Sequence, residues 1–146
     1  PMALQSLMTV CTGNICRSPL AEGLLRLSLP NTRVYSAGLA AVIGHPATPE
    51  VLTLAQDMGA NISAHRAQQI SAYLVQSAQL ILTAELAQKQ WIESNYPISR
   101  GRVFLLAQTL GQDIPDPYRQ SQAVHQSTAE LIAQCVSDWA QKIERL

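Results

Sequence analysis

The chain has 146 residues, of which 47% are hydrophobic and 14% are charged, and its formal net charge is zero. This composition predicts a single folded domain over residues 1–146 with a substantial core, and it excludes a disordered chain. The balanced charge argues against a nucleic-acid partner, and no apolar run is long enough to predict membrane insertion or a signal peptide.

Short apolar strands alternate with helices along the chain. Strands are predicted at residues 7–10, 33–37, 79–83 and 103–106. Helices are predicted at residues 19–28, 49–58, 85–94 and 121–146, with a weaker helical signal at 70–76. Ser18 is the predicted N-cap of the first helix, and Gly59 is the predicted left-handed end of the second. Pro1, ahead of Met2, is interpreted as a remnant of expression and is excluded from the fold.

The alternation of strands and helices predicts the fold class. Strands separated by helices form parallel sheets, because the chain must cross over before it adds the next strand. We therefore expect an α/β fold with a doubly wound, four-stranded parallel sheet and helices on both faces. Ligands of such folds bind at the carboxyl ends of the strands. The loop after the first strand is thus the expected binding site.

That loop is the segment CTGNICRS, in which Cys11 precedes Arg17 by six positions. Such a loop points backbone N–H groups into its own hollow, and the helix that follows adds partial positive charge. The hollow suits a tetrahedral oxyanion such as phosphate, and Arg17 can bind two of its oxygens. Cys11 would lie beneath the anion as a thiolate nucleophile. The predicted phosphate-binding residues are Thr12, Gly13, Asn14, Ile15, Cys16, Arg17 and Ser18.

Thiolate attack on a phosphate monoester also needs an acid that protonates the leaving oxygen. Asp116 is the candidate, because the prolines on either side of it stiffen its loop and could hold the carboxyl over a cleft. Tyr118 offers an aromatic face that could stack on a phenyl ring in that cleft. The sequence therefore predicts Cys11, Arg17 and Asp116 as catalytic residues.

These segments resemble the low-molecular-weight protein tyrosine phosphatases over essentially the whole chain. The matching segments are residues 11–19 with Ala21-Glu22, Ser36-Ala37-Gly38, residues 80–83 and Asp116-Pro117-Tyr118. The resemblance implies hydrolysis of protein phosphotyrosine and aryl phosphates through a phosphocysteine on Cys11. It also implies that Asp116 is the general acid in the first step and activates water in the second.

The resemblance assigns supporting roles as well. Asn14, Ser18, Ser36 and His65 match positions that, in the family, form a hydrogen-bond network around the loop. Cys16 matches a second loop cysteine that can form a reversible disulfide with the nucleophile and protect it from overoxidation. Simple packing in the loop is the alternative role for Cys16.

A narrower resemblance is to the bacterial subgroup linked to capsule and exopolysaccharide export. It rests on residues 36–39, 41–44, 114–119 and 121. It implies that the partner is a membrane tyrosine autokinase, whose tyrosine-rich tail the subgroup dephosphorylates, and that Leu39 lines an open cleft wall. Gln68 and Ala84 depart from an arginine and a methionine that are common in the family.

The remaining cysteines and charged residues set further expectations. Three cysteines, an odd number, argue against a disulfide framework and favour a reducing compartment, the cytoplasm. Cys135 is expected in the core, and His125 on the surface of the last helix. Glu85 is expected to complement a helix dipole rather than to support the site. We expect no cofactor, no metal site, and a monomer or weak dimer.

Two other functions stay open at this point. A thioredoxin-coupled arsenate reductase resembles this fold and loop, but it needs two further cysteines after the third strand. This chain has none between Cys16 and Cys135. A non-catalytic phosphoprotein-binding module would have lost part of the chemistry, whereas every chemical group is present here.

Overall fold

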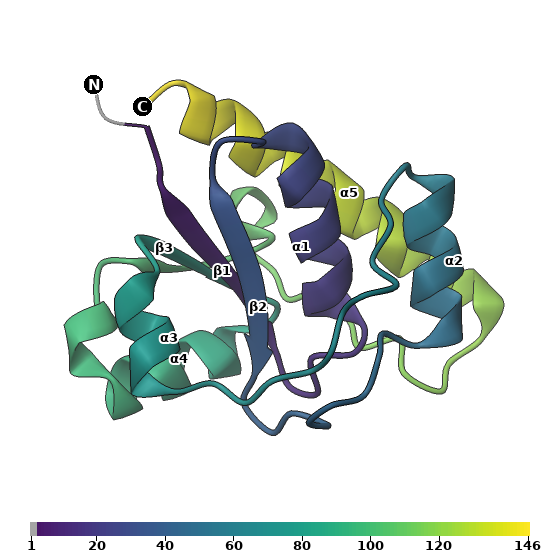
Figure 1. The fold of residues 1–146 in the computed structure, drawn as a ribbon, viewed down its shortest axis with the longest axis horizontal. Helices are drawn as coiled ribbons and strands as arrows, with labels where there is room; N and C mark the ends of the chain where they lie inside the picture. Colours follow the sequence, from purple (N-terminus) through teal and green to yellow (C-terminus); the bar gives the residue numbers. More distant parts are fainter. Residues whose placement is uncertain (1–2) are drawn as a thin grey trace.

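The computed structural model describes residues 3–146, and the interpretation of Pro1 lies outside the described residues. Its strands are β1 (Ser6–Cys11), β2 (Arg33–Gly38), β3 (Leu80–Thr83) and β4 (Val103–Leu105). They form one parallel sheet in the order β2-β1-β3-β4 (Figure 1). The predicted four-stranded parallel sheet is therefore confirmed.

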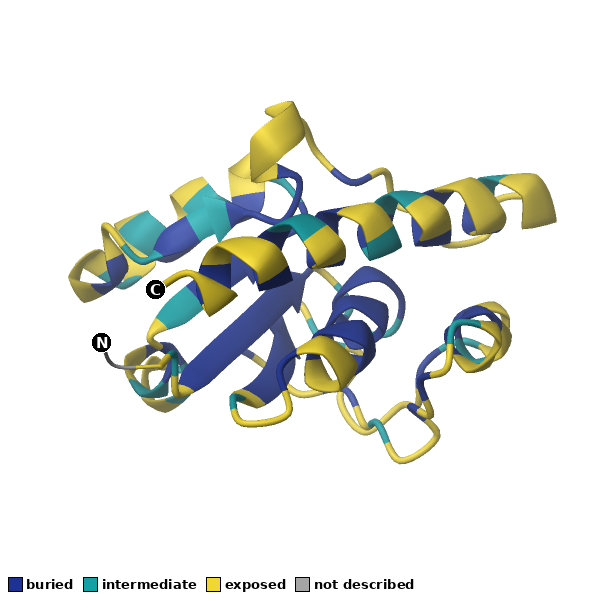
Figure 2. Cartoon of the chain, turned by 90° about the horizontal axis from the view of Figure 1, so that it is seen from above, coloured by how far each residue is buried: buried dark blue, intermediate teal, exposed yellow. Residues whose placement is uncertain are grey.

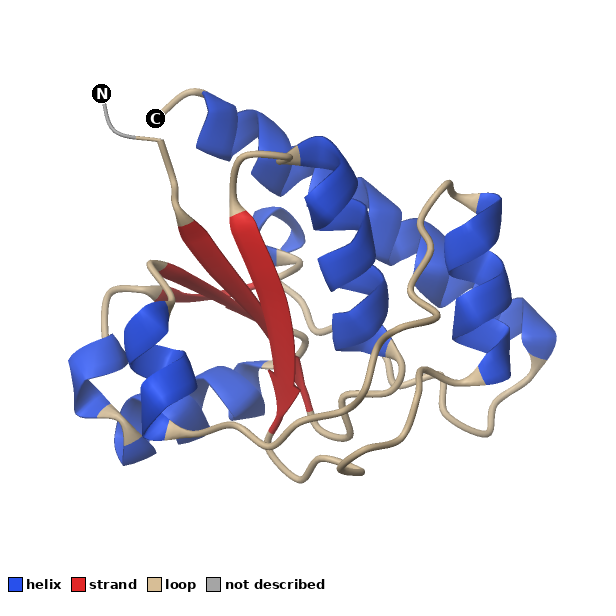
Figure 3. Ribbon diagram, viewed as in Figure 1, coloured by secondary structure: helices blue, strands red, loops and turns tan. Residues whose placement is uncertain are grey.

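Helices cover both faces of this sheet (Figure 3). They are α1 (Arg17–Ser28), α2 (Pro49–Asp57), α3 (Ala72–Ser77), α4 (Leu86–Asn95) and α5 (Gln122–Glu144), with single turns η1 (Pro97–Ser99) and η2 (Gln108–Leu110). One apolar cluster packs α1, α2 and α5 on one face, and a second cluster packs α3 and α4 on the other. The doubly wound arrangement is confirmed.

The position of β1 inside the sheet explains why its sequence does not alternate between apolar and polar residues. All six of its residues are buried, and the centre of the sheet is buried with it (Figure 2). Leu7 and Cys11 belong to the cluster under α1 and α5, whereas Met8 and Val10 belong to the cluster under α3 and α4. A strand with helices on both faces needs apolar side chains on both faces.

The strand register brings the loops after β1, β2 and β3 to one edge of the sheet. Cys11 pairs with Gly38 of β2, and Val10 pairs with Thr83 of β3, so three strands end together. Gly38 allows the close approach of the first loop, because a Cβ there would lie 2.4 Å from the carbonyl oxygen of Thr12. The backbone at the end of β2 thus lies close against the loop at the predicted binding edge.

Two predictions about helix ends have different outcomes. Gly59 has φ +91° just after α2, so its predicted left-handed conformation is confirmed. Ser18 is not the N-cap of α1, which begins at Arg17 after Cys16. The hydroxyl of Ser18 is instead hydrogen-bonded to Cys11 and Asn14, contacts that a local capping pattern does not reveal.

No helix within residues 3–146, including the 23-residue α5, is both long and apolar enough to span a membrane.

His125 is buried rather than on the surface, so its predicted placement is wrong. Only 4% of its area is exposed, and it extends the buried stripe of α5 that also contains Ala129, Ile132 and Cys135. Cys135 lies in the core as predicted. The imidazole of His125 lines a void of about 10 Å³ with Arg17 and apolar side chains. Its Nδ1 has no hydrogen-bond partner within the described residues.

Replacing His125 with leucine should stabilise the fold. The change removes a buried polar atom that lacks a partner, and we expect the free energy of unfolding to rise by about 1 kcal/mol. Urea denaturation measures it. His45→Leu is the matched control, because His45 is exposed and its replacement should have little effect. Lower stability of the His125→Leu protein would contradict the prediction.

Candidate active site

The loop after β1 is held by its carbonyl groups. The carbonyl oxygens of Cys11, Thr12, Gly13 and Ile15 accept hydrogen bonds from backbone N–H groups in residues 39–48. In a planar trans peptide the N–H points away from the C=O. The loop N–H groups are thereby directed toward the side opposite residues 39–48. Asn14 supports this turn with φ +60°, a left-handed conformation that asparagine tolerates.

A cavity of about 270 Å³ opens above this loop. It brings together Cys11 and Arg17 with Asp116 and Tyr118 from the loop before α5. The lining also includes Thr12, Gly13, Ile15, Cys16, Ala40 and Val42. Residues predicted to act together, but far apart in the chain, thus line one cavity.

Three predicted residues do not line this cavity. Leu39, expected in the cleft wall, packs against the apolar cluster of α3 and α4, and Ala40 and Val42 form the wall instead. Asn14 and Ser18 are buried and do not line the cavity, and binding of phosphate by this part of the loop stays a prediction. Their side chains serve the loop rather than the cavity.

Arg17 is the point at which the segments of the site meet. Its side chain is 3% exposed, and Nη1 donates to Glu85 Oε2 at 2.5 Å and to the carbonyl oxygen of Ile114 at 2.8 Å. Its Nη2 lies 3.9 Å from Asp116 Oδ2. Because Nη1 is held in this way, the orientation of the guanidinium is fixed, and Nε and Nη2 are the donors left for an oxyanion.

Glu85 has two roles, of which the sequence predicted only one. It is the N-cap of α4 in a capping box with Gln88, as its place at the helix start suggested. It also forms the ion pair with Arg17, so the expectation that it does not support the site is wrong. The partner lies 68 positions away in the chain, and no local pattern signals the pair.

Asp116 lies on an anchored loop but remains accessible. Its side chain is 55% exposed, and its Oδ1 accepts a hydrogen bond from the backbone N–H of Tyr118 at 3.1 Å. Ile114, two residues earlier, is fully buried and donates its N–H to the carbonyl oxygen of Ala84. This arrangement suits a carboxyl that must exchange protons with substrate and water.

The structure shows a hydrogen-bond network beneath the loop. Asn14 Nδ2 donates to the hydroxyls of Ser18 and Ser36, and Ser18 Oγ lies 2.9 Å from Cys11 Sγ. His65 Nε2 lies 2.7 Å from the carbonyl oxygen of Asn14, which can only accept, so Nε2 carries the hydrogen. Asn14, Ser18, Ser36 and His65 are therefore in contact as the resemblance implied.

Two further residues belong to this network. Gln68, which departs from the arginine common in the family, donates its backbone N–H to Asn14 Oδ1 and a side-chain amide hydrogen to the carbonyl oxygen of Ser36. Glu22 accepts a hydrogen bond from Ser36 Oγ and pairs with Arg26. Sequence reasoning missed the role of Glu22. Glu22 lies four positions from both Ser18 and Arg26, so all three share one face of the helix. This spacing is the sequence signal that could have indicated the contact.

Comparison with known proteins identifies the family. The low molecular weight phosphotyrosine protein phosphatase family matches residues 6–146. The chain belongs to this family. It is 43% identical over 143 residues to the probable low molecular weight protein-tyrosine-phosphatase EpsP of Ralstonia nicotianae, covering 98% of this chain and 99% of that protein. The predicted enzyme class, a protein-tyrosine-phosphatase, is confirmed.

Solved structures agree with this membership. Vibrio vulnificus Wzb in complex with benzylphosphonate matches with a TM-score of 0.92 and 36% identity, covering 96% of this phosphatase and 99% of that chain. The YwlE arginine phosphatase from Geobacillus stearothermophilus matches with a TM-score of 0.90 and 28% identity, covering 97% and 94%. The fold of the phosphatase is thus shared with members that differ in their named substrate.

Cys16 of the phosphatase is a buried thiol on the cavity wall. Burial raises the pKa of Cys16 to about 11, although its contact with Thr48 Oγ1 at 3.6 Å acts in the opposite direction. Cys11, Cys16 and Cys135 are all free thiols in the structure. The reversible disulfide between Cys11 and Cys16 stays a prediction.

The raised pKa of Cys16 predicts slow alkylation at neutral pH. In a Cys11→Ser, Cys135→Ser protein, the rate with iodoacetamide should rise about tenfold for each pH unit from pH 7 to 10, because only the thiolate reacts. The same protein unfolded in urea is the control, and its rate should level off near the ordinary thiol pKa of about 8.5. A folded protein whose rate levels off at that same pH would contradict the raised value.

Proposed function

We propose that the phosphatase hydrolyses phosphotyrosine in proteins, and aryl phosphates, through a phosphocysteine intermediate on Cys11. The observation that carries this proposal is the cavity in which Cys11, Arg17 and Asp116 meet. A nucleophile, an anion clamp and a proton donor in one cavity are the groups that hydrolysis of a phosphate monoester needs. A phosphoprotein-binding module would not need Asp116.

In the first step the phosphate lies in the hollow of the loop. Loop N–H groups and the free donors of Arg17 bind its oxygens and stabilise the charge of the transition state. The Cys11 thiolate attacks phosphorus, a sulfur–phosphorus bond forms, and the bond to the aryl oxygen breaks. Asp116 gives its proton to that oxygen, and the phenol leaves.

In the second step the carboxylate of Asp116 acts as a general base. Asp116 takes a proton from a water molecule, and the oxygen of that water attacks the phosphocysteine. The sulfur–phosphorus bond breaks, inorganic phosphate is released, and the Cys11 thiolate is restored. Asp116 is exposed enough to meet water, which supports this second role.

The cavity rim favours an aromatic leaving group. Tyr118 is 44% exposed at the rim, and Ile15, Ala40 and Val42 add apolar surface. A phenyl ring can pack against these groups while its phosphate reaches the loop below. Benzylphosphonate, bound in the related Wzb structure, has the same combination of an aromatic ring and a phosphorus oxyanion.

The partner proposed for this site is the tyrosine-rich tail of a membrane tyrosine autokinase linked to exopolysaccharide export. Support comes from the subgroup resemblance of residues 36–39, 41–44, 114–119 and 121 and from the similarity to EpsP and Wzb. Because an arginine phosphatase shares the fold, phosphoarginine is the competing substrate to be assayed beside phosphotyrosine.

Cys11→Ser should abolish hydrolysis of p-nitrophenyl phosphate while binding of inorganic phosphate persists, because the loop and Arg17 are unchanged. Phosphate release and calorimetric titration measure the two effects. Cys135→Ser is the control, because that thiol lies in the core far from the cavity lining. Hydrolysis that survives Cys11→Ser would disprove the mechanism.

The Cys11→Ser protein also serves as a trap for the partner. Incubated with a lysate, it should retain a tyrosine-phosphorylated autokinase, and a Cys11→Ser, Arg17→Ala protein should not. Retention of an unrelated phosphoprotein would contradict the proposed partner and leave the enzyme class intact.

Asp116→Asn should slow the reaction according to the leaving group. We expect a loss of about 10²–10⁴-fold with phenyl phosphate, whose phenolate needs a proton, and a much smaller loss with p-nitrophenyl phosphate. Asp113→Asn is the matched control on the same loop, since Asp113 accepts a hydrogen bond from Leu86 and does not line the cavity. Equal losses for both substrates would remove Asp116 from the role of acid.

A further inference from the structure

The turn that follows Asp116 contains an arginine where its backbone favours glycine. The carbonyl oxygen of Pro117 accepts a hydrogen bond from the N–H of Gln120 at 2.9 Å, so residues 117–120 form a turn. Arg119, the third residue of this turn, has φ +62°. Glycine or asparagine ordinarily occupies such a position, because a longer side chain crowds the backbone at positive φ. Strained positions of this kind are typical of functional segments.

The side chain of Arg119 lies at the rim of the candidate active site. Its Cζ is 5.2 Å from the centroid of the Tyr118 ring. Tyr118 lines the cavity together with Cys11 and Asp116, whereas Arg119 is not part of the lining. The guanidinium therefore lies outside the cavity, next to its aromatic wall. A group that adjoins a bound phosphotyrosine can meet it there, but the phosphate inside the cavity cannot.

The charge of Arg119 is available to a ligand. The residue is exposed. The cations that form ion pairs within residues 3–146 are Arg17, Arg26 and Lys89, and Arg119 is not among them. Its contact with an aromatic ring does not neutralise its charge. A carboxylate of a bound ligand would therefore find an unpaired guanidinium at this rim.

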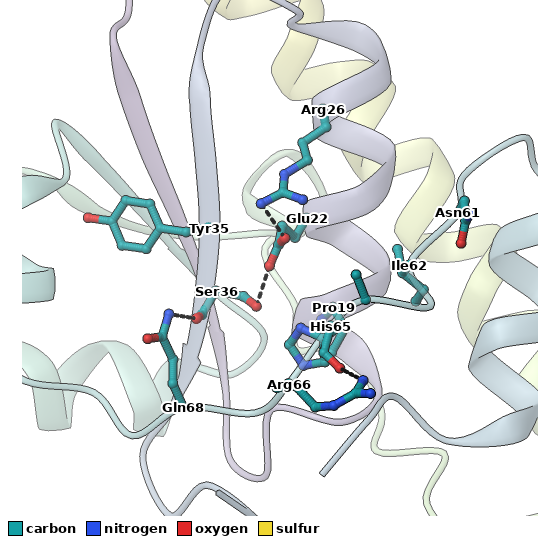
Figure 4. Close-up of a pocket in the computed structure, with 11 residues that line it drawn as sticks. Pro19, Glu22, Arg26, Tyr35, Ser36, Asn61, Ile62, His65, Arg66 and Gln68 are labelled. Atoms are coloured by element: carbon teal, nitrogen blue, oxygen red, sulfur yellow. Dashed lines mark hydrogen bonds and ion pairs between the residues drawn. The ribbon is translucent and has the colours of Figure 1, made fainter. Parts of the chain in front are cut away.

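Two other exposed arginines differ from Arg119 because the protein itself occupies them. Figure 4 shows Arg26 directed to the carboxylate of Glu22, and Arg66 directed to the backbone carbonyl of His65. Both arginines line a separate cavity of about 240 Å³, which shares no lining residue with the candidate active site. Neither is placed to contact a substrate bound over the phosphate-binding loop.

Arg119 is also the source of positive charge in the two segments that form the cavity wall. Residues 39–48 contain no lysine or arginine, and residues 111–121 contain Arg119 alone. The acidic residues of the second segment, Asp113 and Asp116, accept hydrogen bonds from backbone N–H groups and form no ion pair with Arg119. The rim therefore presents one cation that attracts negative charge on the substrate.

We propose that Arg119 is a specificity-determining residue, which favours phosphotyrosine flanked by an acidic residue. The flanking carboxylate pairs with the guanidinium while the phosphotyrosine fills the cavity. The planar fork of an arginine matches a carboxylate with two parallel hydrogen bonds. The inference rests on the proposed function and narrows its substrate class. Because the pair is exposed to solvent, it should contribute a few-fold preference rather than an all-or-none selection.

Two phosphotyrosine peptides test the inference, one with glutamate on each side of the phosphotyrosine and one with glutamine at both places. The unaltered protein should hydrolyse the glutamate peptide with a kcat/KM about threefold higher at low salt. Arg119→Gln, which removes the charge and keeps a similar chain length, should abolish this preference. Arg119→Lys, which keeps the charge, should retain most of it. All three proteins should hydrolyse p-nitrophenyl phosphate at the same rate, since this substrate has no flanking residue.

Salt and a distant arginine provide the controls. The preference for the glutamate peptide should disappear near 1 M NaCl, where charges are screened beyond about 3 Å. Arg145→Gln removes the same charge beyond the other end of the 23-residue α5, a helix about 35 Å long. Its preference should equal that of the unaltered protein, which separates a local pair from an effect of net charge.

Arg119→Gly is the second variant, because glycine adopts the positive φ of the turn without strain. It should also lose the preference. Equal hydrolysis of the two peptides by the unaltered protein would overturn the inference. An equal loss for both peptides and for p-nitrophenyl phosphate in the Arg119 variants would also overturn it, because Arg119 would then act only by holding Tyr118. Failure of the unaltered protein to hydrolyse either peptide would overturn the proposed function, and the inference with it.

Discussion

A buried guanidinium is the constraint on which the site depends. Removing Arg17 from water is costly unless its N–H groups find acceptors, and Glu85 with the carbonyl of Ile114 provides them. These acceptors come from the start of α4 and from the loop that carries Asp116. Satisfying one charge therefore brings three distant segments together, and the same contacts position both the proposed phosphate-binding group, Arg17, and the loop of the proposed acid, Asp116.

The two chemical partners differ in their surroundings because they do different work. Cys11 is buried at the end of β1, and its sulfur lies 2.9 Å from the hydroxyl of Ser18, which is itself buried. Asp116 is largely exposed, on a loop fixed by the buried Ile114. The difference suits the proposed roles, because a nucleophile that attacks in line needs a fixed position, whereas an acid that later activates water needs contact with solvent.

Short-range patterns predicted much of the fold and the three residues, Cys11, Arg17 and Asp116, that line one cavity. The apolar run of β1, the glycine-containing loop and the helix start are contiguous, so their meaning can be recognised locally. The wrong predictions share a physical cause. Ser18 bonds to Cys11 rather than capping a helix, Leu39 turns toward the other face of the sheet, and His125 packs inside. In each case a tertiary contact decided which way the side chain faces.

The sequence by itself determined the parallel α/β architecture, the loop between β1 and α1, and the residue types proposed as nucleophile, clamp and acid. Only the tertiary structure decided that Glu85 holds Arg17, that Ala40 and Val42 form the cavity wall, and that Glu22 accepts a hydrogen bond from Ser36 of β2. Local patterns encode backbone conformation and burial through neighbours a few positions away. Hydrogen bonds between side chains far apart in sequence depend on strand register and helix packing, which the complete fold alone specifies.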